Sequence, residues 1–440
     1  MSEASVDLPP VSREQAFLET FFQCISQFAY EKARELAEKE KDSNPSGSHG
    51  PWGCMVAALA QLAHTEKAYI SLMYLVPNWF GRKDSLRHTY SSLLAEFRKI
   101  EDSVSRQTNP EPVDTLIGHL CGQLWQYVQA RSKTMDFYDQ VATMGSMKFV
   151  NFEDLHVVIT DIIQTHQKSF HHPILSPLKT LFSTECDIIC HLLKAQIDMS
   201  QCKFLPSLLH LNDASSKLSS CQAQQMEKEN KLFGFGSPSK TSQRPALYQW
   251  LWKFKGMLLS KFSLYFHEIL SKQAPSGEMK NIGGKLSVDL FAKIATFQRK
   301  ADATNVSLVL DTNGLAEPYR GLGYQHPQKF TEPLTGLDSY PAIFSYPGER
   351  PQKHLPAIVS NIQDQAKTLA TSDKTVCVFN EFEKTQCTYF MSRVECLVTL
   401  VVIFENKKSE KDSFINSFIQ EVTTILRLTK LFTGIKPGKG

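Results

Sequence analysis

Through residues 1–275, apolar positions recur every three or four residues, which is the spacing of an amphipathic α-helix. Short stretches rich in Gly, Ser, Pro or Asp separate these periodic segments. The longest uninterrupted pattern, 113–144, would measure about 50 Å at about 1.5 Å per residue, so we expect an elongated bundle. The predicted helices cover 12–41, 52–75, 83–101, 113–144, 152–166, 174 to beyond 197, 206–231 and 246–271.

The stretch 168–211 holds the most apolar of these patterns. It opens with Phe170-His171-His172-Pro173, where side-chain hydrogen bonds are expected to satisfy the backbone at the helix entry. The apolar stripe that follows is broad and includes Cys186 and Cys190, one helical turn apart. A stripe of that width needs cover on more than one side. We therefore predict that this helix lies at the centre of the bundle.

Beyond the Gly- and Pro-containing segment 273–284, which we predict to be a break, the pattern changes. A helix at 286–299 is followed by short runs rich in β-branched residues, the order being strand, strand, helix, three strands, helix. Three consecutive strands with short turns predict an antiparallel meander, and 397–404 is apolar enough to be covered on both faces. The predicted strands are 306–310, 342–346, 375–379, 385–391 and 397–404, and the helices are 355–369 and 412–428.

This pattern predicts a fold in two parts. An elongated helical bundle at 1–275, with an exposed linker near 232–245, precedes an α/β domain at 285–435 with a mainly antiparallel sheet. The order of elements in the second part is similar to the longin, roadblock and profilin group of small α/β folds, although the insertion 311–339 is longer than the hairpin those folds have. Such a likeness carries little functional weight.

Composition narrows the range of functions. A chain of 440 residues is too long for one core, which agrees with two domains. Its net charge of +3 lacks the clustered positive face that binding to nucleic acid requires, so no nucleic-acid partner is expected. Ten cysteines show no C-x-x-C spacing and are expected to be reduced core thiols. The polar N-terminus and the absence of a long apolar run predict a cytoplasmic protein without a signal peptide or a membrane span.

Candidate chemistry is sparse. The sequence 283–287 (GGKLS) lacks the first glycine and the Ser or Thr of a phosphate-binding loop. A zinc site could be built from Cys186, Cys190 and His191 with His171 and His172, and a metal-dependent hydrolase could use His171, His172, Cys186 and Cys190. A cysteine pair flanked by Ile and Leu is more often part of a core, however, and His191 is predicted to point off the face that carries the two cysteines. We therefore predict no catalytic residues, no metal and no cofactor, with the hydrolase as the less favoured alternative.

Other residues are candidates for regulation or for partner contacts. Ser176 and Ser237 each precede a proline, and Ser237 in the predicted linker is the more credible phosphorylation site. The segment 321–327 is either a loop that reads a partner or a packed Ω-loop, with the two interpretations equally weighted. The residues that we predict to contact partners are Tyr324, His326, Lys407 and Lys408.

Several collinear segments, spanning nearly the whole chain, resemble the KICSTOR subunit 2 family. The segments are ETFF at 19–22, RKDS at 82–85, FHHPILSPL at 170–178, CHLLKAQ at 190–196, KFLPSL at 203–208, KFSLYFHE at 261–268, GYQHP at 323–327 and FENKKSE at 404–410.

The resemblance implies a noncatalytic scaffold. The family works with kaptin, an FG-GAP-repeat protein and a very large seizure-threshold scaffold to hold the GATOR complex, which stimulates GTP hydrolysis by Rag GTPases, at the lysosomal membrane. It thereby restrains TOR complex 1 when amino acids or glucose are scarce. The family offers no catalytic residues to transfer to this chain. A direct regulator of a small GTPase, acting through the α/β part, is the alternative.

Overall fold

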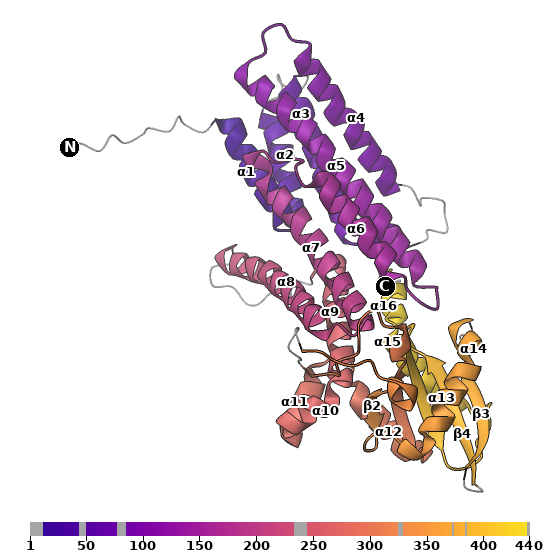
Figure 1. Ribbon diagram of the computed structural model, residues 1–440. Coiled ribbons are helices and arrows are strands. Elements are labelled where there is room, and N and C mark those ends of the chain that lie inside the picture. The colour runs from indigo at the N-terminus through magenta and orange to yellow at the C-terminus, as the bar shows by residue number, and fades with distance from the viewer. Residues whose placement is uncertain are drawn as a thin grey trace.

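The computed structural model describes residues 12–43, 50–76, 85–232, 244–323, 329–371, 374–382 and 385–437. The molecule is elongated, with long helices at one end and a β-sheet at the other (Figure 1). The predicted class, helices joined to a mainly antiparallel α/β part, is confirmed as α+β. None of the described helices has an apolar stretch long enough to cross a membrane.

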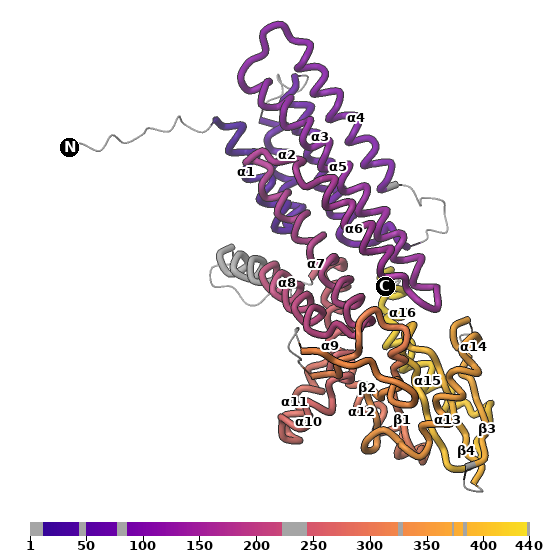
Figure 2. Tube along the Cα trace, in the orientation of Figure 1, coloured from indigo at the N-terminus to yellow at the C-terminus, as the bar shows by residue number. Residues whose placement is uncertain are grey.

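The N-terminal part is built from helices that pack mainly on their neighbours in sequence, as the trace in Figure 2 shows. The longest is the one predicted to be longest, α5, with 33 residues. The helices are α1 (Arg13–Ser26), α2 (Tyr30–Ser43), α3 (Pro51–Ile70), α4 (Ser85–Ser105), α5 (Pro112–Met144), α6 (Phe152–His166), α7 (Ser176–Ser200), α8 (Phe204–Leu232) and α9 (Ala246–Tyr265).

Two predicted helices are interrupted. The prediction of one helix over 12–41 is wrong, because the chain turns between α1 and α2 at Phe28, whose φ is 61°. The predicted helix 52–75 stops at Ile70 for the same reason, since Leu72 has a φ of 56° and only a short 3₁₀ turn, Met73–Leu75, follows. A left-handed residue cannot continue a right-handed helix, and helices commonly end at one.

Helix α7 lies where its broad apolar stripe predicts. It packs against α1, α6, α8 and α9, and Cys186 and Ile188 are fully buried within it. The prediction for its entry is also confirmed, because the Nδ1 atom of His172 accepts a hydrogen bond from the backbone N–H of Ile174 at 3.3 Å. This cap begins the 3₁₀ turn Pro173–Leu175 that leads into α7.

The region between the two parts differs from the prediction. The expected helix 246–271 is divided at Phe266 into α9 and α10 (His267–Gln273). The predicted break at 273–284 is wrong, because most of it forms α11 (Ser276–Lys285). Pro275 stands just before the first residue of α11, where its missing N–H removes no helical hydrogen bond, so the proline starts this helix rather than preventing it.

The C-terminal part follows the predicted order. Helix α12 (Leu290–Ala301) leads into a five-stranded antiparallel sheet with the strand order β2-β1-β5-β4-β3. The predicted meander is confirmed by the pairing of β3 with β4 and of β4 with β5. The strands are β1 (Asn305–Leu310), β2 (Ala342–Tyr346), β3 (Val376–Phe382), β4 (Thr385–Arg393) and β5 (Val398–Phe404).

Helices cover both faces of the sheet. Alternate residues of a strand point to opposite faces, so in β5 Val402 joins the core beneath α12 and α15 (Ser413–Leu426), while Val401 and Ile403 join the core beneath α13 (Leu355–Asp364) and α14 (Ala366–Thr371). Every residue of β5 is buried, as predicted. The predicted helix 355–369 is divided at Gln365 into α13 and α14. The predicted helix 412–428 is shorter in the structure, because it ends just before Leu428, which has a φ of 62°.

The core under α12 and α15 continues into the helical bundle. The last helix, α16 (Thr429–Thr433), lies between the two parts (Figure 1), and the ring of Phe432 contacts Phe152 of α6 and Trp250 of α9. The proposed division into 1–275 and 285–435 and the longin-like assignment both stay predictions. Most of the predicted linker 232–245, including Ser237, lies outside the described residues.

The ten cysteines are free, as predicted. Cys24, Cys121, Cys186 and Cys387 are buried, whereas Cys396, in the turn between β4 and β5, is exposed. Burial raises the pKa of the Cys121 thiol and of the Cys186 thiol well above their ordinary value. These two side chains therefore stay protonated and behave as apolar core residues.

Gly145, which ends α5, touches α16 so closely that only glycine fits. A Cβ atom there would lie 2.5 Å from the backbone N of Thr433 and 2.7 Å from the carbonyl carbon of Phe432. We expect Gly145→Ala to lower the free energy of unfolding by about 1 to 3 kcal/mol, the usual cost of overpacking. Urea denaturation of the variant and the wild type measures this change in the free energy of unfolding. Gly284→Ala, where a Cβ would meet nothing within 4 Å, is the matched control and should not lower stability. Equal losses in both variants would contradict this reasoning.

Candidate interaction groove and buried charge clusters

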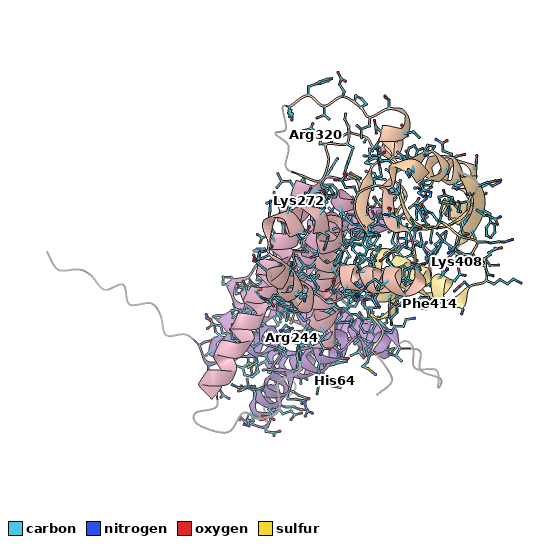
Figure 3. The ribbon with its side chains drawn as sticks, turned by 90° about the horizontal axis from the view of Figure 1, so that it is seen from below. His64, Arg244, Lys272, Arg320, Lys408 and Phe414 are labelled. Carbon is cyan, nitrogen blue, oxygen red and sulfur yellow. The ribbon has the colours of Figure 1, made fainter. Side chains whose placement is uncertain are left out.

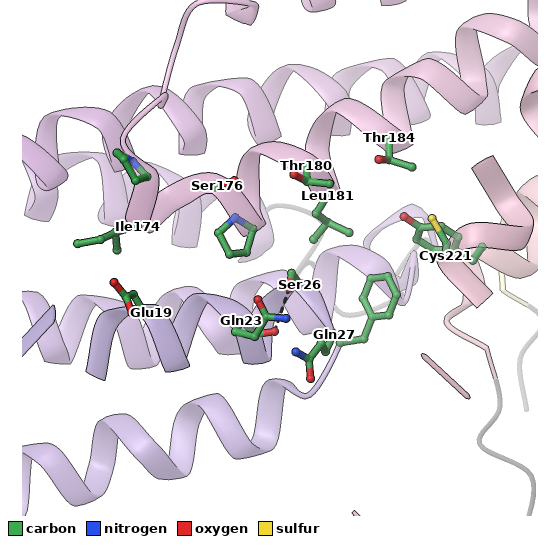
Figure 4. A pocket seen from close by; sticks show the side chains of 14 residues that line it. Glu19, Gln23, Ser26, Gln27, Ile174, Ser176, Thr180, Leu181, Thr184 and Cys221 are labelled. Atoms are coloured by element: carbon green, nitrogen blue, oxygen red, sulfur yellow. Dashed lines mark hydrogen bonds between the residues drawn. The ribbon is translucent and has the colours of Figure 1, made fainter. Parts of the chain in front are cut away.

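A groove of about 560 Å³ runs between α1 and α7 (Figure 4). Glu19, Gln23 and Gln27 line one side of it, and Ser176, Thr180 and Thr184 line the other. Ile174 and Leu181 are buried residues that form part of its lining. The groove therefore offers amide and hydroxyl groups along its sides and an apolar base.

The turn at each end of the groove explains its shape. At one end, the left-handed Phe28 turns the chain away from α1, and its ring packs 5.2 Å from that of Tyr248 on α9. At the other end lies the segment 170–175, which we call the strap and which precedes α7. It is held against α5, because the backbone N–H of His172 donates to Oε1 of Gln123 at 2.9 Å. The sides are thus held by hydrogen bonds and ring packing outside the groove itself.

The groove presents mainly hydrogen-bonding groups. Its two weakly acidic side chains are Cys221 and Tyr248, and burial raises the pKa of both above their ordinary values. A protonated thiol is a poor nucleophile, and a protonated phenol is not a base. Within the described lining, the remaining polar groups are hydroxyls, amides and the carboxylate of Glu19, which can hydrogen-bond to a peptide.

The bundle core holds a buried cluster of charges that was not predicted from the sequence. Arg131 of α5 donates through Nε to Glu66 at 3.1 Å and through Nη1 to Glu185 at 2.6 Å. All three side chains are 1% exposed. Four tyrosines donate hydroxyl hydrogen bonds to the two carboxylates, namely Tyr90 and Tyr127 to Glu66, and Tyr69 and Tyr138 to Glu185. The cluster joins α3, α4, α5 and α7.

A second buried cluster joins the helices to the sheet. Lys261 of α9 pairs with Glu395, which lies in the turn between β4 and β5. Glu395 also accepts hydrogen bonds from Gln196 of α7 at 2.8 Å and from the hydroxyl of Tyr265 at 3.3 Å. Lys261 is 1% exposed and Glu395 is 8% exposed. We call these four residues the junction cluster.

Comparison with known proteins identifies the family. A family model described as "KICSTOR complex C12orf66 like" matches residues 7–440. The chain belongs to this family. A protein named "KICSTOR subunit 2" from Xenopus laevis is 42% identical over 445 residues, which covers 98% of this chain and 99% of that protein. A protein of the same name from Danio rerio is 43% identical over 444 residues, covering 98% of both chains. The family resemblance seen in the sequence is thus confirmed.

Two segments that carry the resemblance to the KICSTOR family build the features described above. The segment 170–178 supplies the strap and the first turn of α7 beside the groove, and 261–268 supplies Lys261 and Tyr265 of the junction cluster. The resemblance therefore includes one segment that shapes the groove and another that joins the helices to the sheet.

The predicted partner-binding residues lie apart from the groove, where the structure describes them. Lys407 is exposed, with its ammonium 6.0 Å from the ring of Phe379. Lys408, which Figure 3 labels, is only partly exposed. Its ammonium donates to the carbonyl of Ala301 at 3.4 Å, so part of its role is structural. Tyr324 and His326 lie outside the described residues. The partner contacts of all four residues stay predictions.

The residues of the hydrolase alternative have other roles in the structure. His172 caps the entry to α7, and Cys186 is fully buried. His171 is exposed, and Cys190 lies 3.6 Å from Nε2 of His156 on α6. Within the described ranges, these four residues are not among the side chains whose ligand atoms are grouped closely enough to hold one metal ion.

Proposed function

We propose that this chain is a noncatalytic subunit of the KICSTOR complex. The observation that carries the proposal is the match of the family over residues 7–440, together with relatives named KICSTOR subunit 2 that align along 98% of the chain. The character of the groove supports it, because its partly buried thiol and its buried phenol are held protonated and its remaining groups suit the recognition of a polypeptide.

The finer part of the proposal concerns what the subunit does in the assembly. It works with kaptin, the FG-GAP-repeat protein and the large seizure-threshold scaffold to recruit the GATOR complex to the lysosomal membrane. Through the Rag GTPases it restrains TOR complex 1 when amino acids or glucose are scarce. The chain associates with the membrane peripherally, through these partners, and its longin-like C-terminal part serves as a docking module.

The groove between α1 and α7 is the surface that we assign to a partner subunit. Exposed Thr180 and Gln23 stand on opposite sides of it, and the buried Leu181 lies below them. Hydroxyl and amide groups around an apolar base can bind the backbone and one or two apolar side chains of a docked segment. The strap at 170–175 contributes Pro173 and Ile174 to the lining of the groove.

We expect Thr180→Arg to reduce co-precipitation of the other KICSTOR subunits by about tenfold or more, since filling an interface core costs more than about 1.4 kcal/mol. The full chain is expressed with an affinity tag in cells that lack the endogenous protein, and recovered partners are quantified. Thr143→Arg is the matched control, because Thr143 is also an exposed helical threonine but lies at the far end of α5.

The same cells give a functional measurement. If the groove is the partner site, Thr180→Arg leaves TOR complex 1 active during amino-acid starvation, whereas Thr143→Arg restores its inhibition. Normal partner recovery with Thr180→Arg would exclude the groove and leave the family-level proposal intact. Failure of the wild-type chain to recover any KICSTOR subunit would contradict the proposed function itself.

A further inference from the structure

Three ligand-bearing side chains converge between α7 and α8. Nδ1 of His191, on α7, lies 3.0 Å from Nδ1 of His210, on α8. Asp213 follows His210 by one helical turn and therefore stands on the same face of α8. One potential ligand atom from each of the three residues lies within 4.8 Å of the other two. In the part of the chain that the structure describes, this is the one group of three or more such residues.

A fourth residue orients one of the rings. Oδ2 of Asp198, whose side chain is 7% exposed, lies 3.7 Å from Nε2 of His210. A carboxylate on this side of the ring favours the tautomer with the proton on Nε2, which leaves a lone pair on Nδ1 facing His191. Histidines that bind metals commonly have a carboxylate behind the ligating ring in this way. The arrangement thus has an inner set of donors and an outer carboxylate.

We propose that His191, His210 and Asp213 bind a zinc ion that joins α7 to α8. Two imidazole nitrogens and one carboxylate oxygen form a ligand set that zinc accepts, with water in the fourth position of a tetrahedron. The two Nδ1 atoms are 3.0 Å apart. Zinc–nitrogen bonds of about 2.0 to 2.1 Å would place two corners of the tetrahedron about 3.3 Å apart, so the rings need to separate by only about 0.3 Å. Both histidines are partly exposed and Asp213 is exposed, so an ion has a path to the site.

The site shares His191 with the zinc site considered from the sequence, but it uses neither Cys186 nor Cys190. Those cysteines lie on other faces of α7, and the position of His191 beside α8 brings it to His210 and Asp213 instead. Without an ion, the N–H of one ring donates a hydrogen bond to the nitrogen of the other, which explains the short distance between the two Nδ1 atoms. Zinc binding distinguishes a hydrogen bond between the two rings from a metal ion held by them. The proposal stands independently of the function proposed above.

The test is a zinc titration of the purified full chain after removal of metals with a chelator, in competition with a chromophoric chelator. We expect one zinc ion per wild-type chain. Asp198→Asn should weaken binding by about 10- to 100-fold, as changes behind a ligating histidine do. His210→Ala and Asp213→Ala should weaken it more. The control His171→Ala, which removes an exposed histidine outside the cluster, should bind as the wild type does.

Two further readouts separate a bound ion from a structural effect of mutation. Cobalt should give the visible absorption of a tetrahedral site in the wild-type chain and lose it in Asp213→Ala, a change at an exposed position that the fold tolerates. Zinc should also slow amide hydrogen exchange around 207–214 in the wild type and not in Asp213→Ala. Absence of stoichiometric zinc in the wild type overturns the proposal, as does equal zinc affinity in the wild type, His210→Ala and Asp213→Ala.

Discussion

A chain with methionine in place of Lys261 is expected to lose about 3 to 5 kcal/mol of its free energy of unfolding. The loss arises because Glu395 would remain buried without its cation, while Gln196 and Tyr265 supply only neutral hydrogen bonds to it. Desolvation of an unpaired carboxylate outweighs those bonds. Urea denaturation followed by circular dichroism measures the change.

The surroundings of Lys261 provide the controls. Lys272 makes an ion pair with Glu268 on the surface of α10, and Lys272→Met should change stability little because both side chains are exposed. The double variant Lys261→Met, Glu395→Leu should recover much of the loss, since an apolar pair can replace a buried ion pair. A loss in Lys261→Met no greater than that in Lys272→Met would show that the junction cluster contributes nothing to stability.

The second large effect is expected at Arg131. Arg131→Met leaves two carboxylates, Glu66 and Glu185, buried with hydroxyl donors alone, so we expect a loss of about 3 to 5 kcal/mol or more at neutral pH. Arg131→Lys keeps the charge but cannot reach both carboxylates with a planar fork, and it should restore only part of the loss. Arg98→Met, which removes an exposed ion pair with Glu101, is the matched control.

The size of the Arg131→Met effect should depend on pH. Burial raises the pKa of Glu66 above its ordinary value of 4.5 even though Arg131 opposes the shift, and removing Arg131 takes that opposition away. When folding raises the pKa of a carboxyl group, the contribution of that group to stability is fully present below the pKa of the unfolded state. The contribution is lost as the pH rises through the pKa of the folded state. The variant should therefore be closest to wild type near pH 5 and furthest from it near pH 8. A loss that is constant over this range would contradict the explanation.

Much of the fold follows from local pattern. The 3.6-residue period places α5 and α7 correctly, and the continuous apolar, β-branched run at 397–404 identifies the fully buried strand β5. The helix ends at Phe28 and Leu72 could not be predicted, because both residues adopt left-handed conformations without being Gly or Asn. Tertiary packing stabilises these turns, and the local sequence pattern does not reveal that packing.

The candidate sites were less predictable than the fold. A side chain of His171-His172-Pro173 was expected to cap the helix entry because the segment before the proline is a local signal, and His172 is the residue that does so. Lys261 and Glu395 are separated by 134 residues, and Arg131 and Glu66 by 65, so no spacing within a helix relates the partners. The clearest signal was indirect, since Lys261 and Glu66 each interrupt an apolar stripe of the helix that carries them. A charge in such a place requires a partner from elsewhere in the chain.

The unequal exposure of the cysteines makes the molecule suitable for site-directed labelling without prior removal of its thiols. Cys396, which follows Glu395 in the sequence, is exposed to solvent, whereas Cys186 and Cys121 are buried and stay protonated. A maleimide dye should therefore attach first where the helices meet the sheet. Its fluorescence would report separation of the two parts in real time.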